Sequence, residues 1–91
     1  MRANDDYKFC PEVYVDDKKV APSLPYATYQ DALDAASGIV DAEWSEGQKL
    51  EVFIDLMALR YKEDGEILSW WKEKQLYHLK IAENGTAIET K

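Results

Sequence analysis

The chain has 91 residues, 46% of them hydrophobic, and its 18 acidic and 11 basic side chains give a formal net charge of -7. An acidic balance of this size argues against direct binding to nucleic acid or to an anionic membrane, because either would need a basic surface. The length fits one domain, residues 1–91, with a modest core, and three Trp, six Tyr and two Phe supply apolar area that a disordered acidic tail lacks.

Cysteine content and hydropathy indicate the compartment. Cys10 is the only cysteine, which excludes an intrachain disulfide and is typical of a reducing environment. Residues 1–6 are polar and contain no apolar signal-peptide core, and no stretch approaches the roughly 18 to 20 apolar residues of a membrane span. We therefore expect a cytoplasmic protein that does not enter a membrane.

The first predicted elements are a short hairpin and an extended connection. Residues 13–15 and 19–21 flank Asp16-Asp17-Lys18, a pattern that favours a small β-hairpin. Two prolines within residues 22–27 then predict an extended segment that leads into a helix.

An amphipathic helix is predicted over about residues 28–44. Thr28 stands at the expected N-cap, three residues before Asp31, and Ser45-Glu46-Gly47 follows the last turn. Polar side chains share one side of this helix, and apolar side chains recur on the other side at the helical period. The apolar side comprises Tyr29, Ala32, Leu33, Ala36, Ile39, Val40 and Trp44.

Residues 50–61 fit the period of a strand and that of a helix. We favour a strand, because Asp64-Gly65 is a strong hairpin signal and a hairpin needs a strand before its turn. A two-residue turn would place Tyr61 opposite Leu68, Leu59 opposite Trp70 and Ala58 opposite Trp71. The alternative is a second helix, whose apolar stripe would comprise Leu50, Phe53, Ile54, Met57 and Tyr61.

A second hairpin is predicted near the end of the chain. We interpret Lys72-Glu73-Lys74 as a break, followed by a strand over residues 76–83, a turn at Asn84-Gly85 and a strand over residues 86–90. The predicted fold is therefore α+β: a mostly antiparallel sheet, with hairpins at Asp64-Gly65 and Asn84-Gly85, and one amphipathic helix packed on one face.

No residue pattern predicts catalysis, a metal site or a cofactor. His78 is the only histidine, and Leu76 and Lys80 are its neighbours on one side of the predicted strand, so we interpret it as a surface histidine. Cys10 is interpreted as a small, partly buried hydrophobe. No glycine-rich phosphate loop and no calcium-binding loop is present. We therefore expect a protein that is not an enzyme and that binds no cofactor or metal.

Acidic residues gather on and just after the predicted helix. No Lys or Arg occurs between Lys19 and Lys49. Acids near the carboxyl end of a helix oppose its dipole at a cost of about 0.3 to 1 kcal/mol each, which favours a role in binding. The alternative is that the helix stops near Asp41 and that the following acids lie in a solvated loop. The acids concerned are Asp31, Asp34, Asp41, Glu43 and Glu46.

Trp70 and Trp71 are adjacent in a predicted strand, so they point to opposite faces of the sheet. One helix covers one face only, which leaves the other tryptophan on an apolar patch that favours an interface. The alternative is that the amino-terminal segment, with Tyr7, Phe9 and Tyr14, or a strong curl of the sheet covers this patch within the chain.

We therefore expect a small, non-catalytic protein that acts by stoichiometric contact with a protein partner. A specific version is an inhibitor that presents carboxylates to a basic nucleic-acid-binding surface; phage-encoded inhibitors and DNA mimics share this size and charge, which is an analogy of kind only. Two alternatives stay open: an assembly subunit that forms a homodimer through the apolar sheet face, and a small-molecule-binding domain with aromatic pocket walls. The candidate partner-binding residues are Asp31, Asp34, Asp41, Glu43, Glu46, Trp70 and Trp71.

Overall fold

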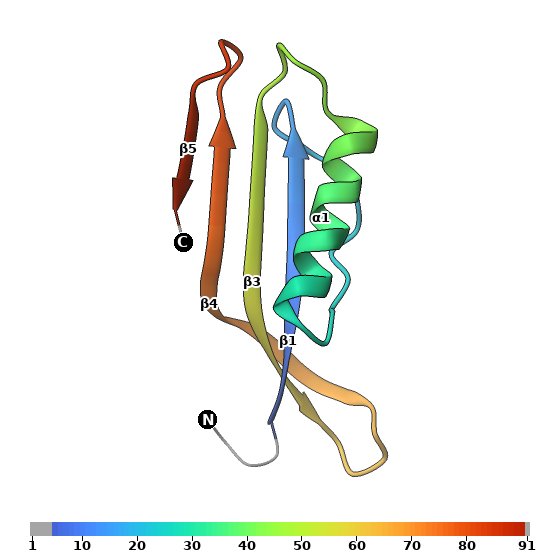
Figure 1. Ribbon diagram of the computed structural model, residues 1–91. Coiled ribbons are helices and arrows are strands. Elements are labelled where there is room, and N and C mark those ends of the chain that lie inside the picture. Colours follow the sequence, from blue (N-terminus) through green and yellow to red (C-terminus); the bar gives the residue numbers. More distant parts are fainter. Residues whose placement is uncertain (1–4, 91) are drawn as a thin grey trace.

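The computed structural model describes residues 5–90, so residues 1–4 at the polar start of the chain lie outside the description. It has one antiparallel sheet in the order β2-β1-β3-β4-β5 and one helix (Figure 1). This arrangement confirms the predicted α+β fold. The elements are β1 (Asp5–Val15), β2 (Lys18–Lys19), α1 (Tyr29–Glu43), β3 (Leu50–Tyr61), β4 (Ile67–Ile81) and β5 (Ala87–Thr90).

The helix α1 begins and ends where the sequence predicts. The Thr28 hydroxyl accepts a hydrogen bond of 3.1 Å from the backbone N–H of Asp31, and Trp44, with φ -113 and ψ 142, takes the chain out of the helix. Ala32 and Ala36 are buried at 0% and 3% exposure. Their small side chains let the helix approach the sheet closely.

The core lies between α1 and one face of the sheet. Val13 and Val15 from β1 and Leu50 and Val52 from β3 meet Ala36 of the helix there. These positions alternate along their strands, because successive side chains of a strand point to opposite faces. Partly buried side chains that complete this core are Val20, Ile39, Val40, Trp44, Tyr77, Leu79 and Ile81.

Residues 50–61 form the central strand β3, so the alternative of a second helix is wrong. β3 pairs with β1 on one side and with β4 on the other. A central strand satisfies its backbone on both edges, and every side chain of β3 except Tyr61 is buried or half-buried, which explains why this segment is apolar almost throughout.

Strand β1 is much longer than the predicted segment 13–15. It spans Asp5–Val15, and Pro11 lies within it. The N–H of Phe9 donates to the Tyr26 carbonyl, and the Val13 carbonyl accepts from Val20 N–H, so these alternate residues direct their backbone groups to the outer edge. Pro11 shares their parity, and its missing N–H therefore removes no hydrogen bond to β3.

The three turns differ in length from the predicted ones. The β1–β2 turn has two residues, Asp16 and Asp17, whose φ angles of 50 and 67 fit a type I′ turn. In the β3–β4 loop, Lys62 N–H donates to the Glu66 carbonyl at 2.8 Å, which leaves a three-residue loop that ends at Gly65, φ 89. Ala82 and Thr86 enclose a three-residue loop in the same way, with a bond of 2.9 Å.

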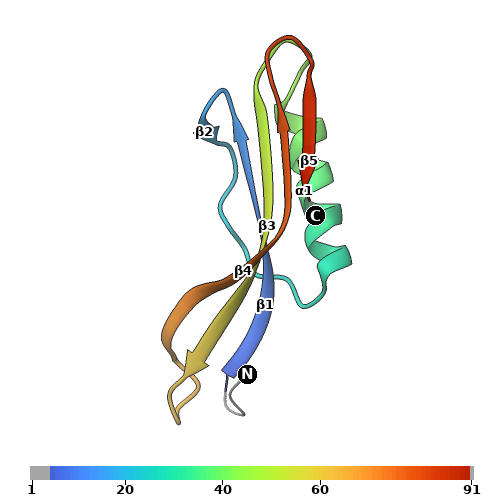
Figure 2. The same cartoon turned by 90° about the vertical axis from the view of Figure 1, so that its left-hand side faces the viewer.

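The predicted break at residues 72–74 does not exist, because β4 continues from Ile67 to Ile81. Leu59 lies opposite Trp70 and Ala58 opposite Trp71, as predicted, whereas Tyr61 lies opposite Ile67 rather than Leu68. Leu68 is the extra residue of one of three register shifts in this pair of strands. Such bulges bend a strand and increase its twist, and the lower β3–β4 hairpin curves away from α1 in Figure 2.

Candidate interaction surfaces

Three acidic side chains, Asp31, Asp34 and Asp41, share the outer face of α1, whereas Glu43 follows the buried Ala36 by two helical turns and lies on the side of the helix that faces the sheet. Asp31, Asp34 and Asp41 are exposed on the helix, Glu43 is its last residue, and Glu46 lies in the loop that follows. Within the described part of the chain, none of these five carboxylates forms an ion pair, and Asp34 accepts one hydrogen bond, of 2.9 Å, from Gln30. The acidic face is therefore open to solvent, and only Glu46 follows the alternative of a loop position.

The two tryptophans lie on opposite faces, and only Trp70 is exposed, at 65%. Trp71 is on the helix side of the sheet, half-buried, with the Arg60 guanidinium 5.5 Å from its ring centroid. Its indole N–H donates to the Glu73 carboxylate at 2.9 Å. Trp70 and the acidic face of α1 therefore belong to different sides of the molecule, and the seven predicted residues do not form one surface.

Trp70 borders a small hollow, which we call the distal pocket, on the face away from α1. Its volume is about 200 Å³. Two hydrogen bonds of 2.8 Å between Phe9 and Tyr26 hold the connection between β2 and α1 along the edge of β1, so that this connection forms one wall. The pocket is lined by Cys10, Ser23, Pro25, Met57, Leu59, Ile67 and Trp70.

Alternation along β1 and β3 accounts for the base of the distal pocket. Cys10 pairs with Asp55 in the register of the two strands, and Met57 and Leu59 follow Asp55 on the same face. Cys10 and Leu59 are buried at 7% and 6% exposure. Sequence reasoning missed Ser23 and Pro25 because nothing local shows that the connection lies against this face.

Asp55 is a buried carboxyl group beside this pocket. It is 2% exposed, its Oδ2 lies 3.6 Å from Lys72 Nζ, and its Oδ1 has no hydrogen-bond partner among the described residues. Burial raises the pKa of Asp55 above its usual range. Burial and the nearby Asp55 also raise the pKa of the Cys10 thiol, so Cys10 is not an activated thiolate.

His78 has a carboxylate partner that the sequence did not reveal. Its Nε2 lies 2.7 Å from Glu51 Oε2, and its ring stacks on Phe53 with centroids 4.5 Å apart. The interpretation of an unpartnered surface histidine missed this contact because Glu51 is 27 residues away in the chain. The strand register would have revealed it, since His78 lies opposite Phe53 and Lys80 opposite Glu51.

The His78–Glu51 pair has no thiol nucleophile within reach. Cys10 shares the face, but two strand spacings of about 4.8 Å and two residue steps of about 3.4 Å separate the Cα atoms by roughly 12 Å. The Tyr14 hydroxyl on the same face donates to Glu12 at 2.7 Å, and this hydrogen bond raises the pKa of Tyr14. The geometry therefore favours a structural role for this aromatic and acidic cluster.

A larger, open hollow of about 520 Å³ lies at the end of the sheet with the β1–β2 turn, between side chains of both charges such as Lys49 and Glu83. Lys49 Nζ is 3.1 Å from Asp17 there. Over residues 5–90, no group of three His, Cys, Asp or Glu side chains is placed to hold a metal ion. In the same range, no helix is long and apolar enough to cross a membrane.

Comparisons with protein-family models, with curated proteins and with solved structures find no match to this chain.

Proposed function

We propose that this protein is a non-catalytic binding protein that acts by stoichiometric contact with another protein through the acidic outer face of α1. One observation carries the proposal: the three carboxylates of this face, from Asp31, Asp34 and Asp41, form no ion pair within the described residues. Intramolecular ion pairs would neutralise such a surface, whereas open carboxylates attract a basic partner and accelerate encounter with it.

The partner surface that fits best is a groove that normally binds nucleic acid. Three carboxylates from Asp31 to Asp41 share the outer face and span about 15 Å at about 1.5 Å per residue, one per roughly 7.5 Å. One strand of DNA carries a phosphate per about 3.4 Å. The helix therefore imitates a short, less densely charged piece of one strand, as a cytoplasmic inhibitor of phage type would need in order to occlude a basic groove.

The test uses a double variant that removes two negative charges from the outer face of α1. A partner captured at low salt and identified by mass spectrometry is titrated with the wild type, with Asp34→Asn/Asp41→Asn, and with Glu63→Gln/Glu83→Gln. Both doubles remove two negative charges at exposed positions, but only the first acts on α1. We expect the first to weaken binding at least tenfold and to reduce its salt dependence, while the second binds as the wild type does.

Two results would contradict the proposal. If both doubles weaken binding equally, net charge rather than the α1 face is responsible. If neither double weakens it, the carboxylates of α1 are not the contact. A competition assay with DNA or RNA on the same partner then tests the finer statement, because an occluding inhibitor must displace nucleic acid from the groove.

The small-molecule alternative has less support. The distal pocket, at about 200 Å³, is smaller than the roughly 300 to 1,000 Å³ of typical ligand sites. The hollow of about 520 Å³ is large enough, but it is open and lined by charged side chains such as Lys49 and Glu83, whereas ligand sites are enclosed and mostly apolar. The homodimer alternative is favoured by the exposed Trp70 beside the distal pocket.

A further inference from the structure

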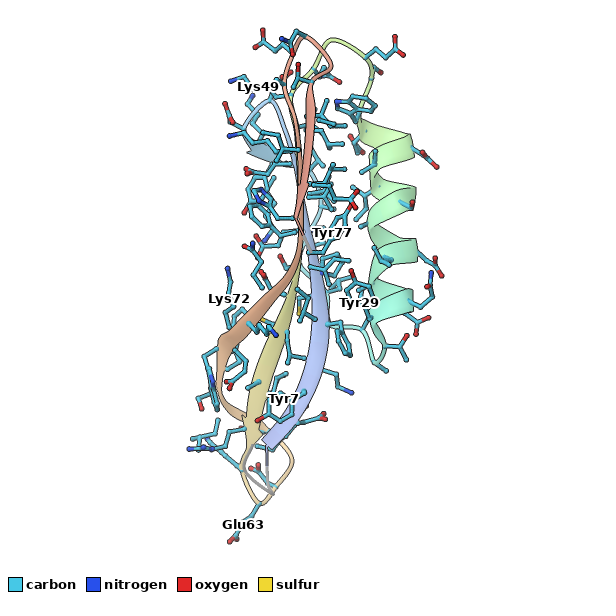
Figure 3. The ribbon with its side chains drawn as sticks, turned by 60° about the vertical axis from the view of Figure 1, so that its left-hand side comes forward. Tyr7, Tyr29, Lys49, Glu63, Lys72 and Tyr77 are labelled. Atoms are coloured by element: carbon cyan, nitrogen blue, oxygen red, sulfur yellow. The ribbon has the colours of Figure 1, made fainter. Side chains whose placement is uncertain are left out.

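We propose that the face around the distal pocket is a homodimer interface, in which the Trp70 side chain of each copy enters the distal pocket of the other around a twofold axis. This inference goes beyond the proposed function, since it concerns the face opposite α1. Figure 3 shows that the two faces differ, with Tyr29 and Tyr77 on the helix side of the sheet and Lys72 on the other side.

The distal face carries both halves of a self-complementary contact. Trp70 and Ile67 are exposed at 65% and 54% on the rim of a pocket of about 200 Å³. A cavity of about 150 Å³ accommodates a benzene ring, so this pocket has room for most of an indole. A twofold interface needs the protruding and receiving parts on the same patch, and this face meets that requirement.

Ser23 also lines the pocket, and its Oγ is buried without a hydrogen-bond partner among the described residues. Because this oxygen is closed off from the surface, a donor from a second copy does not reach it, and the proposed contact depends on apolar complementarity.

The shape of the chain leaves surface to be covered. Its radius of gyration is 14.7 Å, against about 12 Å for a compact chain of this length. Its accessible surface is 6074 Å², against roughly 5400 Å² for a compact monomer of this mass. The excess, on the order of 600 Å², approaches the roughly 800 Å² that each partner contributes to a standard interface. Residues 61–70, the hairpin beyond the helix, are all exposed.

The distribution of charge favours a second copy over a basic partner on this face. Near the distal pocket, Lys72 pairs with Asp55 at 3.6 Å and Lys62 with Glu66 at 3.9 Å, so charges of both signs are already balanced locally. The carboxylates of the α1 face lie on the other side of the sheet, and Glu63 and Asp64 in the hairpin loop likewise form no ion pair among the described residues. Two copies can therefore meet through the face around the distal pocket although each carries a charge of -7. The acidic faces of both helices then point away from the interface.

Sedimentation equilibrium over a range of protein concentrations tests the proposal. We expect the wild type to form a dimer of twice the 10.5 kDa chain mass and to keep it at high salt, because the contact is apolar. Trp70→Ala should raise the dimer dissociation constant by at least roughly 30-fold, as loss of a central aromatic contact does. Trp71→Ala, on the other face, should leave the dimer intact.

A second matched pair guards against variants that fail to fold. Ile67 and Ile88 are exposed at 54% and 64%, so aspartate at either position is compatible with folding. Ile67→Asp, at the pocket rim, should abolish the dimer, and Ile88→Asp, on β5, should preserve it. A monomeric wild type at 100 μM, chosen as roughly the range of weak interfaces, overturns the proposal. So does equal loss of the dimer in Ile67→Asp and Ile88→Asp.

Failure of the dimer and failure of the proposed function are separable. The variants of Trp70 and Ile67 leave the carboxylates of α1 unchanged, and the Asp34→Asn/Asp41→Asn double leaves the distal face unchanged. The double should therefore sediment as the wild type does. A double that dissociates overturns the inference that the two faces act independently.

Discussion

The two halves of the β3–β4 ladder have different surroundings. In the upper half, residues 50–54 pair with residues 77–81, and in the lower half, residues 57–61 pair with residues 67–72. In the upper half, α1 covers one face, and Leu50 and Val52 are buried at 2% and 4% exposure (Figure 1). In the lower half no helix covers the sheet, and Ile67, Leu68 and Trp70 are at least half exposed. In the same half, Ala58 and Leu59 of the central strand β3 stay buried at 0% and 6% exposure. Hydrophobic sequence alone therefore does not place a residue in the core of this protein, because a central strand is covered by its neighbours, whereas β4 is half-buried mainly where α1 lies over the sheet.

The difference also separates two tasks. The covered half supplies the buried apolar contacts on which folding depends, since burial of apolar surface is the main stabilising contribution. In the uncovered half, β4 contributes little burial within one chain, and its exposed apolar side chains are available for contact with another molecule. Variants that compare the halves residue by residue therefore separate stability from association.

The largest difference is expected between two leucines. Leu50→Ala removes a side chain that is 2% exposed from the core and should lower the free energy of unfolding by about 2 to 5 kcal/mol. Leu68→Ala, at a position that is 57% exposed, should change it by less than about 0.5 kcal/mol in the monomer. Urea denaturation at a protein concentration too low for association measures both. Equal losses would show that the hairpin is as much part of the core as the helix-covered half.

Asp55, near the junction of the halves, should give the stability a characteristic pH dependence. Burial raises its folded pKa above the reference of 3.8, so between these two values the folded state binds more protons than the unfolded state. The contribution of Asp55 to stability therefore falls as pH rises through this window and stays unfavourable above it. Asp55→Asn should be about 1 kcal/mol more stable than the wild type at pH 7.

Unfolding curves at several pH values check this sign. The advantage of Asp55→Asn should shrink as pH falls through the window and vanish below the unfolded pKa. Asp34→Asn, at an exposed carboxylate, is the control and should show no such trend. An advantage of Asp55→Asn that is constant with pH would mean that the buried charge is not its origin.

The last comparison concerns α1, the helix that covers the upper half of the ladder. Thr28→Ala removes the N-cap hydrogen bond to Asp31 and should lower the free energy of unfolding by about 1 kcal/mol, whereas Thr28→Ser should retain most of it. Hydrogen exchange then localises the loss. We expect faster exchange at the first amides of α1 and unchanged exchange at Lys62, whose N–H bonds within the hairpin. Faster exchange at Lys62 as well would show that the halves unfold together.

Local patterns predicted the elements whose signals are complete within a few residues. The helix needs only its cap at Thr28 and the periodicity that follows. β3 needed the hairpin signal at Asp64-Gly65 in addition, because its apolar run fits both periods. The pairs Leu59–Trp70 and Ala58–Trp71 were predicted correctly even though the loop has three residues rather than two, because the bulge at Leu68 compensates for the longer loop.

Elements whose determinants are distant were predicted poorly. From the sequence alone, Pro11 argues against a strand. It is compatible with β1 because the backbone groups of Phe9 and Val13, which share its parity, point to the outer edge of the sheet. The Lys72-Glu73-Lys74 run reads as a break, but β3 supplies a continuous partner and register shifts absorb the extra residues. In both cases a neighbouring strand outweighs the local preference.

The candidate surfaces divide in the same way. The sequence by itself determined the acidic face of α1, since carboxylates at helical spacing without a nearby Lys or Arg are visible in the chain. It also determined that Trp70 and Trp71 face opposite ways. Only the tertiary structure decided that Trp70 is the exposed one, that Ser23 lines its pocket, and that Glu51 meets His78. These contacts depend on strand register and on the path of the connection to α1, which are set by packing between residues far apart in the chain.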